Sequence, residues 1–535
     1  MKAPRSLFDP EVQRVMEQAS TSAFPSPADW RDHWIYFLMV DRFNNPNAPP
    51  RHTPFDDPGF FGFQGGKFSG VRQALPYLKR LGAGAIWLSP VLKNLPFDDS
   101  AYHGYGIHDF LCAEPRFAED PDRADEELRT LVDAAHTMGM YVIFDVVLNH
   151  TGNVFAYEPN GGVLWRDATG TPRFRAVENI SDRPRGALVW PVELQRDHFF
   201  RRQGAPRADG DETVGDFGPL KQMMTGNEEV QRLLIRAYQY VIARFDADGF
   251  RIDTLRYLKG DLARRFGEAM RSFASTIGKR NFFTFGGRYA TSAGIDAVYD
   301  YGLYDRLRGV IKGLTPPAAL EEVYRGRSHG EATRRYVTFL DNHDVKQRVR
   351  YFPPGGERQF DAQVTLGLCC LFALPGIPCL YYGTEQGLHG AGSDPGVREA
   401  LWGGPGLDED NIFFREVARI AEIRRREAAL RYGEFYLRPV SGDGVNFGIS
   451  PFPQGVIAFS RILDGKEAIV VANTSVSETV RLHVLVDAQL GRAGSAYRLI
   501  YSNRSDPCLP GPVETGPPSR FRFTLWPLEA QILIS

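Results

Sequence analysis

Short apolar segments alternate with amphipathic segments along most of this chain. Residues 34–40 (WIYFLMV) are all apolar or aromatic and predict a buried strand. Residues 85–88 (AIWL) predict a second strand of the same kind. Between them, a helix is predicted over residues 71–81, with Gly82 at its end, because the apolar positions fall on one face: Val71, Ala74, Leu75, Leu78 and Leu81.

The same alternation continues further along the chain. Residues 126–138 carry a helical pattern that Gly139 follows, and residues 141–147 form a third apolar segment. Buried strands separated by helices are typical of a parallel sheet. The sequence therefore predicts an α/β fold, built either as a closed eight-fold barrel or as a large open sheet.

Two regions depart from this alternation. Residues 151–235 are rich in Gly, Pro, Asp and Arg, but they also contain Trp165, Trp190, Phe199 and Phe200, which need a core. We therefore predict an inserted subdomain there. Residues 431–535 contain short strands separated by turn residues and predict a C-terminal antiparallel β-sandwich. Residues 1–150 and 236–430 are left for the main α/β domain.

Composition narrows the class of protein. The chain has 535 residues, of which 43% are hydrophobic and 24% charged, as in ordinary globular proteins. Its formal net charge of −2 argues against a nucleic-acid-binding protein. No apolar run reaches the roughly 18 residues that a membrane helix needs, and the first residues show no apolar signal segment. The aromatic content of 12% fits either a large core or platforms that stack on flat ligands such as sugars.

The cysteines predict free thiols. Their number is odd, two are adjacent, and none shows the spacing of a metal site: Cys112, Cys369, Cys370, Cys379 and Cys508. We expect reduced thiols and a cytoplasmic protein. The sequence leaves the oligomeric state open.

Polar residues follow three of the predicted strands at the point where each apolar run ends. These segments are residues 145–150 (DVVLNH), 248–253 (DGFRID) and 337–344 (VTFLDNHD). In a β/α barrel the carboxyl ends of the strands build the active site. One such segment is readily a cap for the next helix, but three segments that each place Asp beside His or Arg indicate a common site.

Together these segments resemble the signature blocks of the α-amylase family of glycoside hydrolases (family 13) and transglycosylases. Residues 101–105 (AYHGY) resemble the segment that stacks on the sugar, and residues 376–385 resemble the block around the last barrel strand. The blocks occur in the family's order and span nearly the whole chain. The resemblance implies a (β/α)8 TIM barrel with an inserted subdomain after strand 3 and a C-terminal antiparallel β-sandwich.

The resemblance also implies a chemistry and roles for single residues. The substrate is an α-linked gluco-oligosaccharide or glucan, cleaved with retention by two carboxyl groups. Asp253 is implied as the nucleophile, kept ionised by Arg251, and Asp344 as the group that binds sugar hydroxyls and favours the distorted ring. The substrate-binding residues are implied to be Tyr105, His103, His150, Arg251 and His343.

One position departs from the family pattern. The family's general acid is usually a Glu at the end of the fifth strand, and Gly287 occupies that position here. No carboxylate lies between Lys279 and Asp296, and the neighbouring Arg288 does not give up its proton near neutral pH. Because a general acid contributes roughly 10²–10⁴-fold, we expect this chain to cleave ordinary glucans very poorly.

Three explanations of Gly287 stay open. The chain is an engineered acid/base variant, a natural carbohydrate-binding or interaction protein on an amylase scaffold, or an enzyme that uses good leaving groups or an acid from elsewhere. Glu385 and Asp341 are candidates for such an acid, although the resemblance gives them structural roles. Residues 218–224 match no specificity motif, so bond type, and hydrolysis against transfer, are left open.

Many relatives bind calcium, and the residues here argue against an obligatory metal. Asp41 and nearby Asn residues offer hard oxygen ligands, but Lys67 stands where relatives with that site have an Asp ligand. Arg256 and Tyr257 follow the nucleophile where calcium-dependent amylases often have Lys and His. Asn149 is a candidate ligand of a second site. We predict no metal and no cofactor.

Overall fold

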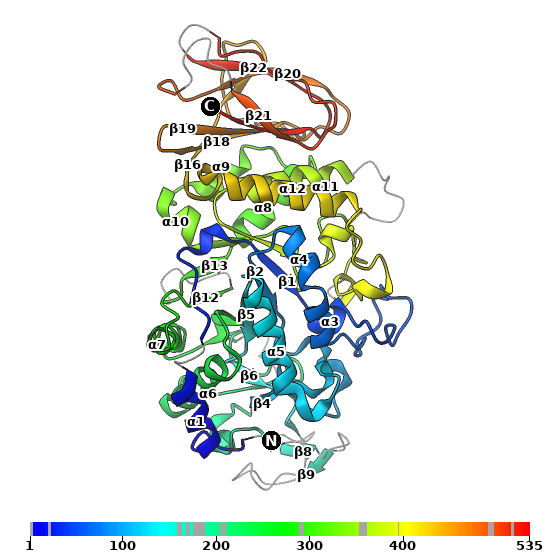
Figure 1. Cartoon of the computed structure of the whole chain (residues 1–535), viewed down its shortest axis with the longest axis vertical. Helices are drawn as coiled ribbons and strands as arrows, with labels where there is room; N and C mark the ends of the chain where they lie inside the picture. The colour runs from blue at the N-terminus through cyan, green and yellow to red at the C-terminus, as the bar shows by residue number, and fades with distance from the viewer. Residues whose placement is uncertain are drawn as a thin grey trace.

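The computed structural model places the chain in an elongated molecule with the C-terminal sheets at one end (Figure 1). It describes residues 4–19, 23–157, 163–166, 172–174, 188–202, 204, 210–287, 294–351, 361–393, 395–490, 497–514 and 518–535. A closed barrel of parallel strands occupies the middle of the molecule.

The barrel closes in the spatial order β1-β15-β14-β13-β12-β11-β5-β2. Every pairing around it is parallel, so the carboxyl ends of all the strands meet at one edge. The strands are short and almost entirely buried: β1 (Ile35–Leu38), β2 (Ala85–Leu88), β5 (Tyr141–Val146), β11 (Gly249–Ile252), β12 (Phe283–Gly286), β13 (Ala297–Tyr299), β14 (Tyr336–Thr338) and β15 (Ile377–Tyr381).

Helices surround the barrel, and some of them also pack against the C-terminal sheets. They are α1 (Pro10–Gln18), α2 (Val40–Phe43), α3 (Phe68–Gln73), α4 (Leu75–Leu81), α5 (Ala124–Thr137), α6 (Glu228–Phe245), α7 (Leu262–Thr276), α8 (Tyr301–Ile311), α9 (Ala319–Tyr324), α10 (His329–Arg334), α11 (Asp361–Ala373), α12 (Ile412–Arg426) and α13 (Ala428–Tyr432). None of the described helices combines the length and the hydropathy that a bilayer crossing requires.

The prediction of a single helix over residues 71–81 is wrong. The chain forms two helices there, and Ala74 separates α3 from α4. Pro76 at the start of α4 has no amide hydrogen, and its ring excludes the carbonyl of Arg72 from a continuous helix. The first strand is also shorter than the apolar run that predicted it, because Val40 already begins α2.

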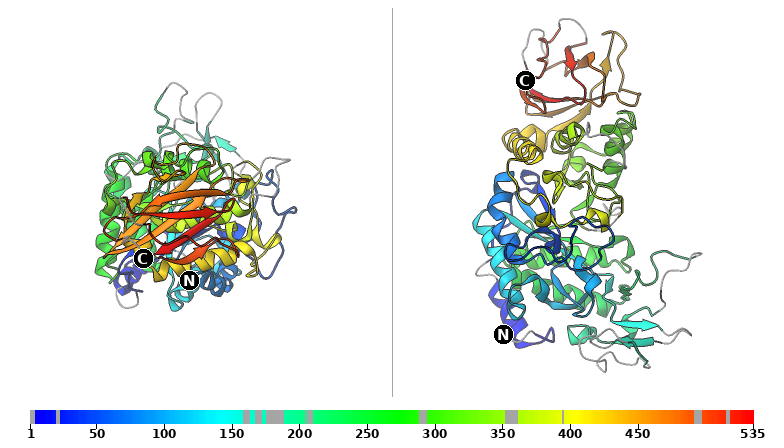
Figure 2. Two further views of the ribbon diagram at one scale, coloured as in Figure 1. Left: turned by 90° about the horizontal axis from the view of Figure 1, so that it is seen from above. Right: turned by 90° about the vertical axis from the view of Figure 1, so that its right-hand side faces the viewer.

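Beyond β5, the chain leaves the barrel and forms small sheets. β6 (His150–Thr151) pairs with β10 (Lys221–Gln222), and β7 (Phe155–Tyr157), β8 (Val163–Arg166) and β9 (Pro172–Phe174) pair in series. Phe199 and Phe200 are buried, as a core within the insertion requires. A further pair, β3 (Leu92–Asn94) with β4 (Ile107–Ala113), precedes this region. Figure 2 shows β8 and β9 projecting at the end opposite the C-terminal sheets.

The C-terminal region consists of two antiparallel sheets. One has the order β16 (Glu434–Leu437), β18 (Val456–Leu463), β19 (Lys466–Asn473), β23 (Ala530–Ile534) and β21 (Arg498–Ser502). The other has the order β17 (Val440–Ser441), β20 (Val480–Leu485) and β22 (Arg520–Leu525). The predicted barrel with C-terminal antiparallel sheets is therefore confirmed, while the boundaries at residues 150, 236 and 431 stay predictions. All five cysteines are free thiols.

Two buried guanidinium groups join the barrel to the C-terminal sheets. Arg461 of β18 donates to Ala373 O at 2.7 Å and to the carbonyls of Leu430 and Gly433. Arg424 of α12 donates to three carbonyls in the same layer: Phe372 O, Leu430 O and Gly376 O. Burial lowers the pKa of both groups, that of Arg461 to about 10. The joint thus pairs the cations with carbonyls at the C-terminal end of α11, where the helix dipole is negative.

Replacing Arg461 with Leu is expected to lower the free energy of unfolding by about 3 kcal/mol, because several buried carbonyls lose their donor. Urea unfolding followed by circular dichroism measures this loss. The matched control is Arg481→Leu on β20, whose side chain is exposed, and which should change stability by less than about 0.5 kcal/mol. Equal stability of the two variants would contradict a structural role for the Arg461 contacts.

Candidate active site

A cleft of about 600 Å³ opens at the carboxyl ends of the barrel strands. Its lining combines strand-end residues with the tip of the hairpin before β10. Its lining includes polar and aromatic side chains: His103, Tyr105, His150, Phe217, Asp253, Asp344 and Arg398. A concave site with a few converging polar groups is the usual form of a small-molecule site.

Arg251 lies at the centre of the polar groups below the cleft. Its Nη1 is 3.0 Å from both oxygens of Asp145 and 3.0 Å from Oδ1 of Asp253. The strand register explains this contact, because Arg251 of β11 pairs directly with Asp145 of β5. Burial lowers the pKa of Arg251, but Asp145, Tyr105 and Asp253 raise it, and the balance leaves it above the ordinary value. A fixed cation therefore lies beside Asp253.

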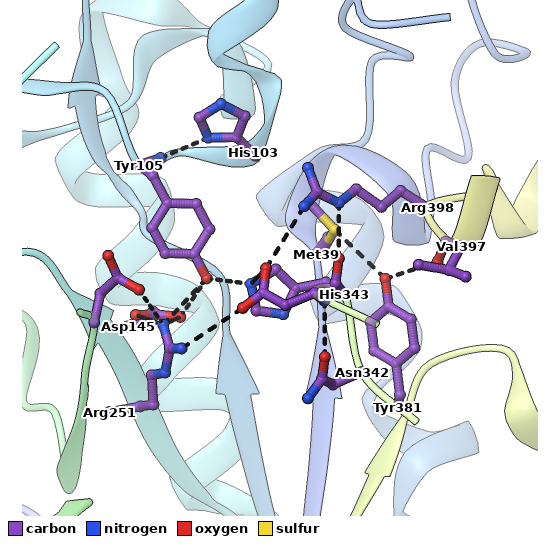
Figure 3. A network of polar contacts seen from close by, with 12 residues as sticks. Met39, His103, Tyr105, Asp145, Arg251, Asn342, His343, Tyr381, Val397 and Arg398 are labelled. Atoms are coloured by element: carbon purple, nitrogen blue, oxygen red, sulfur yellow. Dashed lines mark hydrogen bonds and ion pairs between the residues drawn. The ribbon is translucent and has the colours of Figure 1, made fainter. Parts of the chain in front are cut away.

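Tyr105 connects this cation to the opposite side of the barrel (Figure 3). Its hydroxyl donates to Oδ2 of Asp145 at 2.8 Å and lies 2.7 Å from Nε2 of His343. The two rings are parallel, with centroids 5.5 Å apart. Its backbone N–H donates to Nδ1 of His103 at 3.0 Å, which fixes that ring beside the cleft. Tyr105 thus holds groups from three segments in one arrangement.

Asp344 lies on the other side of the cleft, between three cationic or polar groups. Its carboxylate is 3.2 Å from Nε2 of His343, 3.6 Å from Arg398 and 4.0 Å from Arg251. Burial raises the pKa of Asp344, but His343, Arg251 and Arg398 lower it, and the balance leaves it below the ordinary value. Because 44% of this side chain stays exposed, an ionised carboxylate faces the cleft.

The histidines of the site are neutral across the physiological range. Burial lowers the pKa of His103 and of His343 to about 3, and it also lowers that of His150. Nearby cations such as Arg398 act in the same direction on the first two. Neutral imidazoles can both donate and accept hydrogen bonds, as sugar hydroxyls require.

The low pKa of His343 predicts an acid-sensitive fold. An imidazole with a folded-state pKa of about 3, against 6.5 unfolded, stabilises the protein fully above pH 6.5, and this contribution is lost as the pH falls towards 3. His343→Gln should therefore reduce the loss of unfolding free energy between pH 6 and 4 by about 1.4 kcal/mol per pH unit. Chemical unfolding across this range measures the slope, and His329→Gln, at an exposed position, should leave it unchanged.

Gly287 follows β12 directly beside the end of β11. Gly286 pairs with Ile252, so Gly287 and Asp253 are the next residues along neighbouring strands. A Cβ built on Gly287 meets no atom of the described residues within 4 Å, whereas one on Gly286 would lie 3.0 Å from the Leu255 side chain and 3.1 Å from Ile252 O. The described residues therefore leave room for a Cβ at position 287, while one at position 286 requires its neighbours to shift. Arg288 lies outside the described residues.

The other two carboxyl groups considered as acids are enclosed elsewhere. Glu385 is fully buried and accepts hydrogen bonds from Tyr36 at 2.7 Å and Tyr77 at 3.0 Å. Asp341 accepts from Thr384 and from the backbone of Val349. Neither is among the described residues that line the cleft. Both serve the packing around the last barrel strand.

The structure brings the predicted site residues together. Five line the cleft, Arg251 and His343 lie directly behind it, and Gly287 is beside Asp253. Sequence reasoning missed Arg398 and Phe217, which line the same cleft, and gave Asp145 no role. The position of Asp145 at a strand end was a usable signal. Arg398 and Phe217 lie on loops, where no periodic pattern marks the side that faces a site.

The residues do not fit the calcium sites that the resemblance implies. At the first site, the Lys67 ammonium donates to Ala118 O at 2.7 Å and to Arg116 O at 3.1 Å, so a cation of the chain already serves these oxygens. At the second, Oδ1 of Asn149 accepts a hydrogen bond from Nε2 of Gln222. Calcium needs six to eight free oxygen ligands, which these arrangements do not offer.

Comparisons with known proteins find the α-amylase family. A model of the α-amylase catalytic domain matches residues 37–277. An α-amylase of Streptomyces lividans is 29% identical over 519 residues, covering 83% of this chain. A cyclomaltodextrin glucanotransferase of Klebsiella oxytoca is 25% identical, covering 85% of this chain and 72% of that protein. The chain spans only 54% of the Streptomyces protein.

Solved structures of the same kind superpose on almost the whole chain. The crystal structure of an Anoxybacillus α-amylase has a TM-score of 0.70 at 25% identity, covering 95% of this chain and 98% of that one. An α-amylase of Geobacillus thermoleovorans in complex with acarbose has a TM-score of 0.69 at 25% identity, covering 95% and 99%.

Proposed function

The chain belongs to the α-amylase family, and we propose that it binds α-linked gluco-oligosaccharides or glucans in the cleft as a retaining glycosidase or transglycosidase. In this proposal Asp253 is the nucleophile. The observation that carries it is the single guanidinium of Arg251, held 3.0 Å from Asp253 and 3.0 Å from Asp145 at the strand ends.

Arg251 suits the nucleophile in two ways. Its positive charge lies 3.0 Å from the carboxylate that attacks the anomeric carbon. The hydrogen bond from Nη1 to Oδ1 also fixes the orientation of the carboxylate. The side chain of Asp253 is 13% exposed and lines the cleft, so an oxygen remains available to a bound sugar.

The remaining side chains suit a glucosyl ring in the cleft. Ionised Asp344 accepts hydrogen bonds from sugar hydroxyls, and neutral His103 and His150 can donate or accept them. Tyr105 offers a ring face against which the sugar stacks. Position 287, however, to which the resemblance assigns the general acid, is a glycine and has no proton to donate from a side chain.

Gly287 therefore determines which substrates this chain can use. Asp253 forms a bond to the anomeric carbon while the bond to the leaving group breaks. A sugar alkoxide departs slowly without a proton, whereas fluoride departs as a stable anion. We propose that the chain as it stands is an impaired variant that still transfers a glucosyl group from an activated donor to its nucleophile.

Turnover of α-glucosyl fluoride tests this proposal. We expect the unmodified chain to release fluoride. Added azide should accelerate this release, because it fits beside Gly287 and attacks the glucosyl intermediate. Maltooligosaccharides and isomaltooligosaccharides should be cleaved very little. Gly287→Glu should raise oligosaccharide cleavage by roughly 10²–10⁴-fold, as a restored general acid does. Fluoride-selective measurement and sugar analysis follow the two reactions.

Two control variants sharpen the result. Asp253→Asn should abolish fluoride release because it removes the nucleophile. Gly286→Ala should destabilise the protein because its new methyl group meets Leu255, whereas Gly287→Glu should change the unfolding free energy by less than about 0.5 kcal/mol. Fluoride release that survives Asp253→Asn would contradict the assignment of the nucleophile.

The position of Gly287 also favours a second candidate function, a non-catalytic carbohydrate-binding or interaction protein on the same scaffold. The two functions predict different results for fluoride. A folded protein that binds oligosaccharides by calorimetry but releases no fluoride, with or without Glu at position 287, would support the binding protein. The cytoplasmic location is a further proposal that rests on five unpaired cysteines.

A further inference from the structure

The side-chain amide of Gln222 holds the hairpin that forms one wall of the cleft. Gln222 is 2% exposed, and its Nε2 donates to Thr213 O at 2.9 Å and to Oδ1 of Asn149 at 3.3 Å. Its Oε1 accepts from the backbone of Gly215 at 2.7 Å. The backbone N–H of Gln222 donates to Oδ1 of Asp216 at 2.9 Å. One side chain thus closes the loop on itself and onto the strand end.

A buried ammonium group lies beside the buried carboxylate of Asp216 in this loop. Lys221 is 4% exposed, and its Nζ lies 3.5 Å from Oδ2 of Asp216, which is itself 2% exposed. The oxygens of Asn149, Thr213 and Asp216 are the hard ligands that calcium prefers. Each of them here faces an N–H donor of the hairpin instead.

We infer that Gln222 and Lys221 take the structural place of a metal ion between the barrel and the insertion, and that Gln222 is a positioning residue for the cleft wall. The family resemblance implies calcium in this region, and the hydrogen bonds of Gln222 disagree with it. A cation would have to displace the amide hydrogens from Asn149 and Thr213. The protein therefore keeps its fold without metal.

The hydrogen bonds of Gln222 help to position two residues that line the cleft, His150 and Phe217. His150 pairs with Gln222 across the two short strands β6 and β10. Phe217, at the hairpin tip, is 49% exposed and lies parallel to the His150 ring, with centroids 6.3 Å apart. Loss of the hydrogen bonds of the Gln222 amide should therefore change the positions of both rings in the cleft wall. That these rings contact a bound sugar rests on the proposed function.

Thermal melting with and without calcium tests whether the hydrogen bonds of Gln222 hold the hairpin without a metal ion. The wild-type chain should melt at the same temperature in EDTA and in millimolar calcium. Gln222→Glu keeps the acceptor for Gly215 but turns a carboxylate oxygen towards Asn149 and Thr213. This variant should melt below the wild type in EDTA and recover in calcium, because the ion can then bridge the facing oxygens.

Gln231→Glu is the matched control. Gln231 is equally buried, donates to the carbonyls of Thr225 and Gly260, and accepts from the guanidinium of Arg265 at 2.7 Å. Its replacement should lower the melting temperature in both buffers, because the carbonyls of Thr225 and Gly260 lose their donor. Calcium should not restore stability there, because the guanidinium of Arg265 repels a metal ion. A wild-type chain that loses stability in EDTA, or a Gln222→Glu chain that melts identically in EDTA and calcium, would overturn the inference.

The positioning role has its own readouts. In EDTA, Gln222→Glu should exchange the amide hydrogens of residues 211–220 about tenfold faster than the wild type, with calcium restoring slow exchange. With α-glucosyl fluoride, KM should rise in EDTA and recover in calcium while kcat changes little. Unchanged exchange would overturn the positioning role. A chain that releases no fluoride would instead count against the proposed function and leave the melting and exchange results valid.

Discussion

The arrangement at the centre of this protein depends on one guanidinium group shared by carboxylates from two neighbouring strands. Arg251 is almost fully buried and has Asp145 and Asp253 at contact distance. A buried cation without such partners is strongly unfavourable, and so is each carboxylate without the cation. The parallel register of β5 and β11 brings the groups together, and Tyr105 and His343 then complete the hydrogen bonds around them.

Burial gives these groups their chemical character as well as their position. The same exclusion of water that keeps His343 and His103 neutral strengthens the attraction between Arg251 and the carboxylates. The site thereby holds the Arg251 cation next to hydrogen-bonding rings that are neutral at neutral pH. Such a preorganised set of charges is suited to a reaction that develops positive charge on a sugar ring.

The sequence predicted what local patterns encode. Continuous apolar runs located the barrel strands, and the polar residues at their ends located Asp253, Arg251 and Asp344. It failed at Pro76, a local helix breaker that the continuous apolar face outweighed in the prediction. It also failed where tertiary contacts decide, because Arg398 reaches the cleft from a loop without regular structure. Gln222 was invisible as well, because a single polar residue in an irregular insertion gives no sign of its partners.

The contrast between Asp253 and Gly287 bears on how retained residues should be interpreted. Removing Asp145 or Asp253 would leave Arg251 under-compensated in the interior, so both carboxylates stabilise the fold whether or not they take part in catalysis. Position 287 has no such constraint from the described residues, since a Cβ there meets none of their atoms within 4 Å. The side chain at position 287 can therefore vary without unfolding the barrel, while the contacts of Arg251 with Asp145 and Asp253 persist. An intact charge network shows that the fold is sound, and only turnover of an activated donor distinguishes a working nucleophile from a purely structural one.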